Sequence, residues 1–157
     1  MTTLPGMADE ELLRLDQQLC FSLNAASRAF GGVYRVLLKD LGLTYPQYLV
    51  MLVLWEDGEL PVKRIGERLR LDSGTLSPLL KRLEVAGLVS RERSPEDERS
   101  VTVRLTSEGS ALRERAGQVP RRLLTATGLP IEDLAALRGL LERVTGALDS
   151  ALVEPAP

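Results

Sequence analysis

The sequence predicts a mainly α-helical chain that carries a single β-hairpin. Three observations lead to this fold class. Apolar residues recur every three or four positions near both ends, and apolar and polar residues alternate between positions 88 and 105. Only 4% of the 157 residues are aromatic, so Leu, Val and Ala must fill the core. With 44% apolar and 27% charged residues, the composition is that of one ordinary globular domain.

The first forty residues predict one long amphipathic helix from Asp9 to Asp40. Its apolar residues follow helical spacing: Leu12, Leu15, Leu19, Leu23, Ala26, Phe30, Val33, Leu37 and Leu41. At about 1.5 Å per residue this helix would be roughly 48 Å long, which is more than one small domain can cover. We therefore expect it to pack against a second copy of the chain.

The middle of the chain predicts three helices and the hairpin. The helix starts are marked by Thr44 with Gln47, by Pro61 and by Asp72. The first of these helices is apolar nearly all round and belongs in the core. The expected elements are a helix from Thr44 to about Trp55, a helix from Val62 to Arg70, a helix that ends at Gly87, and strands at 88–93 and 101–105.

Two more helices are predicted after the hairpin. Thr106 caps a helix that runs to about Thr127, and Gly128 to Pro130 separates it from a last amphipathic helix. The apolar face of that last helix is marked by Leu134, Leu137, Leu141, Val144 and Leu148. We assign ranges 9–41 and 107–152 to dimerisation and 44–105 to a compact functional region of the single chain 1–157. The tail from Glu154 to Pro157 is expected to fray.

The residue inventory favours a binding protein over an enzyme. One cysteine and no histidine exclude an internal disulfide, a His-based triad and nearly every transition-metal site. No pair of carboxylates is placed for acid-base work, and no cofactor is expected. No run of 18 apolar residues predicts a membrane span. Met1 to Pro5 lacks the pattern of a secretory signal, so we expect a cytoplasmic protein.

The order of the central elements is typical of a winged helix-turn-helix that binds double-stranded DNA. Residues 61–104 hold ten Lys or Arg and seven Asp or Glu, while the flanking segments are acidic. Small hydroxyl side chains open the expected recognition helix, and cations follow one turn later. The candidate contacts of this helix are Ser73, Thr75, Ser77, Lys81 and Arg82. The alternative is a solvated capping turn.

The tip of the hairpin, here called the wing tip, is residues 94–100. Arg99 could enter a narrow minor groove, where the negative potential attracts guanidinium groups. Asp97 could orient that guanidinium through a bidentate pair. The alternative interpretation is a solvated loop. Three acidic side chains are unfavourable next to DNA phosphates, which favours a role for one of them in positioning Arg99.

Several segments together resemble a known family. The wing residues from Asp97 to Val101 and the segment from Leu105 to Gly109 are similar to those of MarR-type repressors. More specifically, segments 19–21, 43–49 and 71–76 resemble the OhrR branch, which senses organic hydroperoxides. The resemblance implies a dimeric winged-helix repressor that leaves its DNA operator when an N-terminal cysteine is oxidised. The sequence departs from that branch at Asn24 and Arg70, where a tyrosine is common.

The resemblance assigns the sensing role to Cys20. A lone cysteine inside a helix is otherwise a small buried hydrophobe, and a position in the middle of a helix gives a thiolate no support from a helix end. The resemblance also implies that Tyr34 and Tyr45 hydrogen bond to the reactive sulfur. Cys20 and Tyr34 are 14 residues apart on one expected helix, hence roughly 21 Å apart, so they can meet only between subunits. Antiparallel first helices would bring them together.

The implied reactants are an organic hydroperoxide and a small thiol. Oxidation of a thiolate gives sulfenic acid, and with one cysteine in the chain the next thiol must come from outside. Two other interpretations stay open. In one, a MarR-like repressor responds to a small aromatic acid and Cys20 is structural. In the other, the protein is a thiol peroxidase, which would not need a basic wing region.

Overall fold

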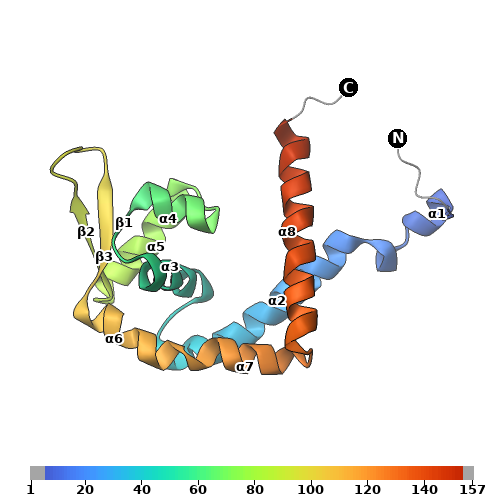
Figure 1. Ribbon diagram of the computed structural model, residues 1–157, viewed down its shortest axis with the longest axis horizontal. Coiled ribbons are helices and arrows are strands. Elements are labelled where there is room, and N and C mark those ends of the chain that lie inside the picture. The colour runs from blue at the N-terminus through green and yellow to red at the C-terminus, as the bar shows by residue number, and fades with distance from the viewer. Residues whose placement is uncertain (1–5, 154–157) are drawn as a thin grey trace. The chain divides into compact units, whose positions relative to one another are not determined.

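The structure is a computed structural model that describes residues 6–153, and it is mainly helical with one small sheet (Figure 1). The N-terminal residues 1–5 and the tail that was expected to fray, 154–157, lie outside the described residues. In chain order the elements are α1 (Asp9–Leu12), η1 (Leu15–Gln17), α2 (Leu19–Leu38), η2 (Lys39–Leu41), α3 (Tyr45–Asp57), β1 (Leu60–Pro61), α4 (Val62–Leu69), α5 (Ser73–Val85), β2 (Val89–Arg93), β3 (Val101–Leu105), α6 (Ser107–Ala116), α7 (Gln118–Thr127) and α8 (Ile131–Val153).

The chain divides into two compact units between Val119 and Pro120. The first unit contains the elements from α1 to α6 and the whole sheet. The second contains most of α7 and all of α8.

Helix α3 lies at the centre of the first unit. Its start is the predicted capping box, because the Gln47 backbone N–H donates to Thr44 Oγ1 and the Thr44 backbone N–H donates to Gln47 Oε1, at 3.4 and 3.0 Å. The prediction that this helix belongs to the core is confirmed. Its buried residues are Gln47, Tyr48, Val50, Met51, Val53 and Leu54.

Helices α4 and α5 form the predicted helix-turn-helix. Arg70 ends α4 in the left-handed region, with φ 58°, and Asp72 begins α5 by accepting the Thr75 backbone N–H at 2.7 Å. Leu76, Leu80 and Leu83 form the buried face of α5. Gly87 follows α5 with φ 77°, a conformation that favours glycine, as predicted for the helix end.

The hairpin is confirmed, and a third strand joins it. The strand order is β1-β3-β2 and all pairs are antiparallel, with Val103 of β3 opposite Leu60 on one side and Arg91 on the other. The sequence analysis missed β1, because two residues are too few to show an alternating pattern. Strand β2 is therefore an edge strand.

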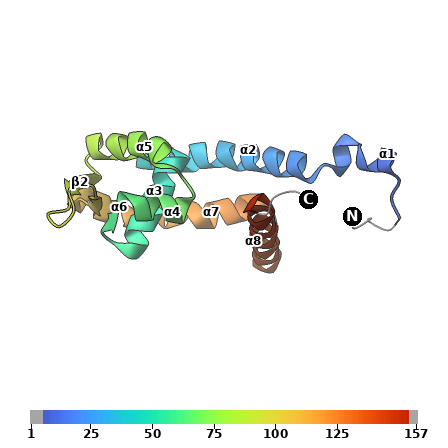
Figure 2. The same ribbon diagram turned by 90° about the horizontal axis from the view of Figure 1, so that it is seen from above.

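The prediction of one unbroken helix from Asp9 to Asp40 is wrong. Arg14 and Gln18 adopt extended backbone, which separates α1 and η1 from α2. The Gln18 side-chain amide donates to the carbonyls of Leu12 and Arg14, at 2.7 and 2.9 Å, and satisfies groups that a continuous helix would pair. Figure 2 shows α2 as a straight rod beyond this bend. Apolar periodicity continues through the bend and so conceals it.

The predicted helix from Thr106 to Thr127 is also two helices. Its start is confirmed, since the Gly109 backbone N–H donates to Thr106 Oγ1 at 3.1 Å. The break lies at Gly117 between α6 and α7. Pro120 has no N–H to donate to the carbonyl four residues earlier, and Gly117 is a weak helix former, so the helix is interrupted here.

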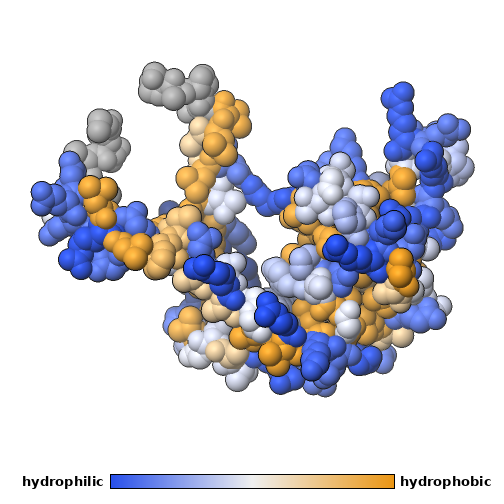
Figure 3. Space-filling view, turned by 180° about the vertical axis from the view of Figure 1, so that it is seen from behind, coloured by the Kyte–Doolittle hydropathy of each residue, from blue (hydrophilic) through white to orange (hydrophobic). Residues whose placement is uncertain are grey.

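Helix α8, the last predicted helix, is 23 residues long, and none of these residues, all of which are described, is buried. Figure 3 shows its apolar side chains in orange. Leu148, Leu152 and Val153 are 61%, 86% and 83% exposed. Of the helices described between residues 6 and 153, none combines the length and the apolar character that a bilayer span requires.

A close approach at Gly109 joins α6 to Leu88, the residue directly before β2. A Cβ at this position would lie 2.0 Å from the Leu88 carbonyl oxygen, which is backbone and cannot rotate away. The Gly109 carbonyl also accepts a hydrogen bond from Trp55 Nε1 at 2.9 Å. The position therefore requires glycine.

We expect Gly109→Ala to lower the free energy of unfolding by about 1–3 kcal/mol, because the added methyl group forces backbone apart. Urea denaturation followed by circular dichroism measures this. Gly117→Ala is the matched control, since its Cβ would meet nothing closer than 3.7 Å. Equal stability of the two variants would contradict the close approach.

Candidate nucleic-acid interface and thiol site

The first turns of α5 present the predicted hydroxyl groups. Ser73, Thr75 and Ser77 are all exposed, while the opposite face of the helix is buried in the core. Asp72 holds this turn, and the Thr75 backbone N–H that it accepts lowers the pKa of its carboxyl. Lys81 and Arg82 lie on the same helix and are exposed. The arrangement offers small donors and acceptors at the helix start, and cations further along.

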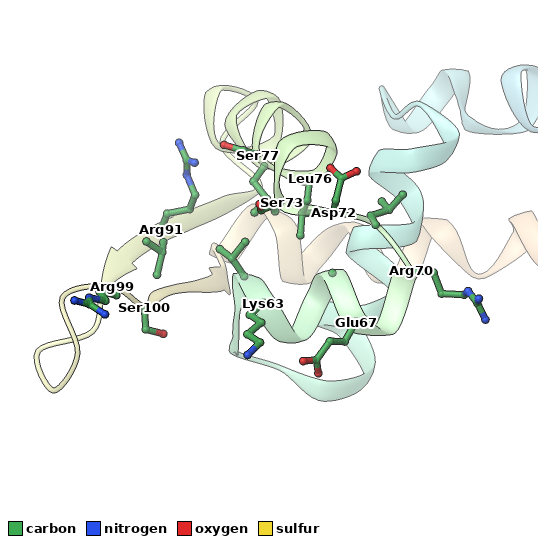
Figure 4. A pocket seen from close by; sticks show the side chains of 15 residues that line it. Lys63, Glu67, Arg70, Asp72, Ser73, Leu76, Ser77, Arg91, Arg99 and Ser100 are labelled. Carbon is green, nitrogen blue, oxygen red and sulfur yellow. The ribbon is translucent and has the colours of Figure 1, made fainter. Parts of the chain in front are cut away.

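A groove of about 750 Å³ lies between α4, α5 and the wing (Figure 4). Its cations are Lys63 from α4, Arg70 at the end of α4, Arg91 from β2 and Arg99 from the wing tip. Hydroxyl groups line it as well, from Ser73, Ser77 and Ser100. The sequence analysis had Arg99 but missed Lys63 and Arg91 as members of this surface. The alternation of Arg91 with Arg93 was visible, but only the fold shows that Arg91 lines the groove.

The wing tip is a folded turn. The backbone N–H of Ser94 donates to the Ser100 carbonyl at 2.8 Å, and that of Ser100 donates to the Asp97 carbonyl at 3.0 Å. Asp97 Oδ1 accepts the Arg99 backbone N–H at 3.0 Å. Asp97 therefore positions the backbone of Arg99, whereas a bidentate pair with its guanidinium was expected. Asp97 contacts Arg99 through the backbone, and the Arg99 side chain lines the groove.

The link between the wing and α5 is an ion pair that the sequence analysis did not find. Glu84, in the last turn of α5, accepts the Arg91 backbone N–H through Oε2 and the Arg91 guanidinium through Oε1, at 3.1 and 3.2 Å. This contact lowers the pKa of the Glu84 carboxyl, chiefly through the side-chain hydrogen bond. Arg91 is therefore held on both its backbone and its side chain.

Cys20 lies at a helix start, which corrects the expectation that it sits in the middle of a helix. Because the chain bends at Gln18, Cys20 is the second residue of α2, and it is exposed. Asn24 Nδ2 donates to Cys20 Sγ at 3.5 Å. The free N–H groups at a helix start favour negative charge, and so does an amide donor. Both features suit a thiolate.

Three tyrosines form a cluster at the join of α2 and α3. The ring centroid of Tyr34 lies 4.5 Å from that of Tyr45 and 5.8 Å from that of Tyr48. Burial raises the pKa of Tyr34 to about 12, with further contributions from the other two rings. Burial also raises the pKa of Tyr48. The structure thus brings together Tyr34, Tyr45 and Tyr48, of which the sequence analysis did not name Tyr48.

Cys20 and Tyr34 both belong to α2. Fourteen residues of helix separate them, which is about 21 Å along the axis. A direct contact within one chain is therefore excluded. No group of His, Cys, Asp and Glu side chains within residues 6–153 is arranged to hold a metal ion.

Comparison with known proteins gives a family match and close relatives. Residues 32–115 match the family model for the transcriptional regulator SarA/Rot. The chain is 50% identical over 129 residues to the organic hydroperoxide resistance transcriptional regulator of Bacillus subtilis strain 168. This alignment covers 82% of the chain and 88% of the relative.

Two solved structures share the fold. Reduced AbfR of Staphylococcus epidermidis bound to DNA has a TM-score of 0.76 and 38% identity, over 90% of this chain and 99% of that one. The PcaV regulator of Streptomyces coelicolor in complex with its natural ligand has a TM-score of 0.78 and 27% identity, also over 90% and 99%.

The tyrosine cluster predicts a late titration step. Tyr34 should ionise near its raised pKa of about 12. Since an unfolded tyrosine ionises near 10, the folded chain binds this proton more tightly, and stability should fall as pH rises from about 10 to about 12. Ultraviolet difference absorbance of tyrosinate, compared between the wild type and Tyr34→Phe, isolates this step. If the component lost in the variant titrates near 10, the buried position of Tyr34 is contradicted.

Proposed function

Because the chain belongs to the MarR/SarA family of winged-helix transcriptional regulators, we propose that it binds operator DNA as a homodimeric repressor and releases it when an organic hydroperoxide oxidises Cys20. One observation carries the redox part of the proposal. Cys20 is exposed at the start of α2, and its sulfur accepts a hydrogen bond from Asn24. The chain that carries it is 50% identical over 129 residues to the Bacillus regulator.

Helix α5 is the recognition helix of the proposal. Small hydroxyl side chains let the backbone of a helix approach base edges in the major groove, and the hydroxyls reach bases or phosphates. Ser73, Thr75 and Ser77 meet this requirement on the exposed side of α5, and Lys81 and Arg82 are placed to neutralise phosphates. The solved complex of the related AbfR with DNA supports DNA binding by this fold.

The wing supplies the second contact. Arg99 stands at the wing tip, where it lines the groove between α4, α5 and the hairpin (Figure 4). A guanidinium group at the end of a narrow ribbon suits the minor groove of A·T-rich DNA. Lys63 and Arg91 then line the wall between the two contacts and face phosphates. Asp97 contributes by fixing the turn that carries Arg99.

The unpartnered apolar faces support the homodimer. On α2, Leu19 and Val36 are 62% and 70% exposed, and on α8, Leu140 and Leu148 are 54% and 61% exposed. Apolar faces of this kind mark interaction surfaces on soluble proteins. We assign ranges 9–41 and 107–152 to the interface with a second copy, with twofold symmetry and two equivalent thiol sites.

The proposed chemistry requires no cofactor. The Cys20 thiolate attacks the terminal peroxide oxygen, the O–O bond breaks, and one proton converts the leaving group to an alcohol, so that ROOH is reduced as the sulfur becomes sulfenic acid. A small thiol then condenses with the sulfenic acid, which gives a mixed disulfide and water. The chain itself holds no second cysteine that could compete with that external thiol.

Donors around the sulfur stabilise the reactive thiolate. Asn24 and the helix start act within the chain. Tyr34 is a neutral phenol at physiological pH, since even an ordinary tyrosine has a pKa near 10 and burial raises the pKa of Tyr34 to about 12, so its O–H can donate. Since Tyr34 cannot reach Cys20 of its own chain, we assign this donor, together with Tyr45, to the second copy.

A regulator gated by a small aromatic acid is the second candidate. The complex of the related PcaV regulator with its natural ligand supports gating by a small ligand, and the cations of the groove in this chain would suit a carboxylate. In this alternative Cys20 is structural, yet structural cysteines are normally buried and Cys20 is exposed. A thiol peroxidase would instead show catalytic turnover, whereas the proposed sensor reacts once per thiol.

The test uses purified protein and a duplex that the wild type selects from a randomised DNA library. With tert-butyl hydroperoxide and a small thiol, the wild type should release the duplex, and the mass of the Cys20 peptide should increase by the attached thiol. Cys20→Ser should bind the same duplex and ignore the peroxide, because a serine hydroxyl cannot form a sulfenic acid. Asn24→Ala, which keeps the thiol but loses its donor, should release the duplex more slowly.

Ser22→Ala is the matched control for Asn24→Ala, because Ser22 is also exposed in the first turns of α2 but its hydroxyl donates to the Gln18 carbonyl. Release of the duplex by Cys20→Ser at the wild-type rate would overturn the redox proposal. Failure of the wild type to select any duplex would overturn the DNA-binding proposal.

A mixed dimer tests whether the donor comes from the other subunit. One chain carries Cys20→Ser and the other carries Tyr34→Phe, so the surviving Cys20 faces the intact Tyr34 of its partner if the site forms between chains. That Cys20 should be oxidised at nearly the wild-type rate, as measured by quenched-flow mass spectrometry. Oxidation as slow as in the Tyr34→Phe homodimer would contradict an antiparallel arrangement of the two α2 helices.

A further inference from the structure

The contact between Glu84 and Arg91 is the direct polar link from the recognition helix to the wing. Glu84 belongs to the last turn of α5 and Arg91 to the middle of β2. Both carboxylate oxygens are used, one on the Arg91 backbone N–H and the other on its guanidinium. The Glu84 and Arg91 side chains are only 39% and 28% exposed. A two-point contact of this kind fixes direction as well as distance.

Strand β2 requires a partner at this point. It is the outer strand of the sheet, so one of its edges has no neighbouring strand. Arg91 stands opposite Val103 of β3, yet its backbone N–H donates to Glu84. The carboxylate thus occupies a hydrogen-bonding position that a further strand would fill, and it attaches the root of the wing to α5.

The position of this attachment determines where the wing tip lies. Because the hairpin folds back after Arg93, which pairs with Val101, Arg99 stands about four residue positions beyond Arg91 along the ribbon. At about 3.3 Å per residue this distance is a lever of roughly 13 Å. A tilt of the strand root by about 15° would move the tip by about 3 Å, which is the length of a hydrogen bond. A free wing would also lose conformational entropy when it binds.

We infer that Glu84 is a positioning residue, which holds the wing at the angle at which α5 and Arg99 engage DNA at the same time. Glu84 lies outside the residues assigned above to DNA contact, and its charge is unfavourable next to phosphate. This inference rests on the proposed DNA-binding function. A positioning role accounts for an acidic side chain beside a groove whose lining includes Lys63, Arg91 and Arg99.

A double-mutant cycle separates positioning from general stabilisation. The probe is the duplex that the wild type selects from a randomised library, and the readout is Kd by fluorescence anisotropy at fixed salt. In the wild-type background Arg99→Ala should weaken binding by roughly 5- to 100-fold. In the Glu84→Gln background, where the charge and one of the two acceptor oxygens are lost and the two-point contact is broken, the same change should cost at least about threefold less. Glu84→Gln alone should weaken binding, although it removes a negative charge.

Two controls accompany this cycle. Lys81→Ala, on α5 itself, should cost the same in both backgrounds, because its position does not depend on the wing. Glu92→Gln removes the same charge from β2, where Glu92 contacts Arg104 at 3.8 Å, and it should leave the effect of Arg99→Ala unchanged. Arg91→Gln provides a second way to weaken the link while the Arg91 backbone N–H is kept. Thermal denaturation of each variant checks that it folds.

The outcomes are distinct. Reduced cost of Arg99→Ala in both the Glu84→Gln and Arg91→Gln backgrounds supports the inference. Equal cost in all backgrounds overturns it while the proposed DNA binding stands. Tighter binding by Glu84→Gln, to the same extent as by Glu92→Gln, also overturns it, since the carboxylate would then act only through its charge. If the wild type selects no duplex, the proposed function fails and this inference fails with it.

Discussion

The first unit depends on the burial of one helix on almost all of its sides. Helix α3 packs against α2, α4, α5, α6 and β3, and its residues Val50, Met51 and Leu54 are fully buried. Such a helix cannot tilt or shift without opening cavities in the core, and cavities cost free energy in proportion to their volume. The surrounding helices therefore take their positions from α3. The helix-turn-helix and the tyrosine cluster are consequently parts of one packed body.

This packing gives the two candidate sites a physical connection. The tyrosine cluster lies at the start of α3, where Tyr45 and Tyr48 contact Tyr34 of α2. Near the other end of α3, the Trp55 indole donates to Gly109 at the start of α6, beside the end of α5. Close-packed side chains of α3 thus connect α2 with α4, α5 and α6. In the proposed sensor, chemistry at the thiol site acts on α2, and α3 is the rigid element between it and the DNA-binding helices.

Local signals made most of the fold predictable from the sequence. Thr44, Asp72 and Thr106 each satisfy free N–H groups at a helix start, and these caps depend only on residues within one turn. The features that the sequence did not predict depend on contacts between residues further apart in the chain. The bend before α2 depends on the Gln18 side chain, which reaches back to the Leu12 carbonyl, while the apolar period continues across it. The groove residues Lys63 and Arg91 are brought together only by the fold. Cys20 was found by its chemistry, but its place at a helix start followed from the bend.

Three acidic residues near the proposed DNA surface share one role. Asp72 accepts the backbone N–H of Thr75, Asp97 that of Arg99, and Glu84 that of Arg91. A carboxylate is a strong acceptor for a backbone N–H, and such bonds define backbone geometry without help from the core. They fix the start of the recognition helix, the wing tip and the wing root. Repulsion from phosphate weakens each acid's net contribution to binding, but a preorganised surface loses less entropy on contact. In this region the basic side chains provide the affinity for DNA, and the acidic side chains determine the shape of the surface.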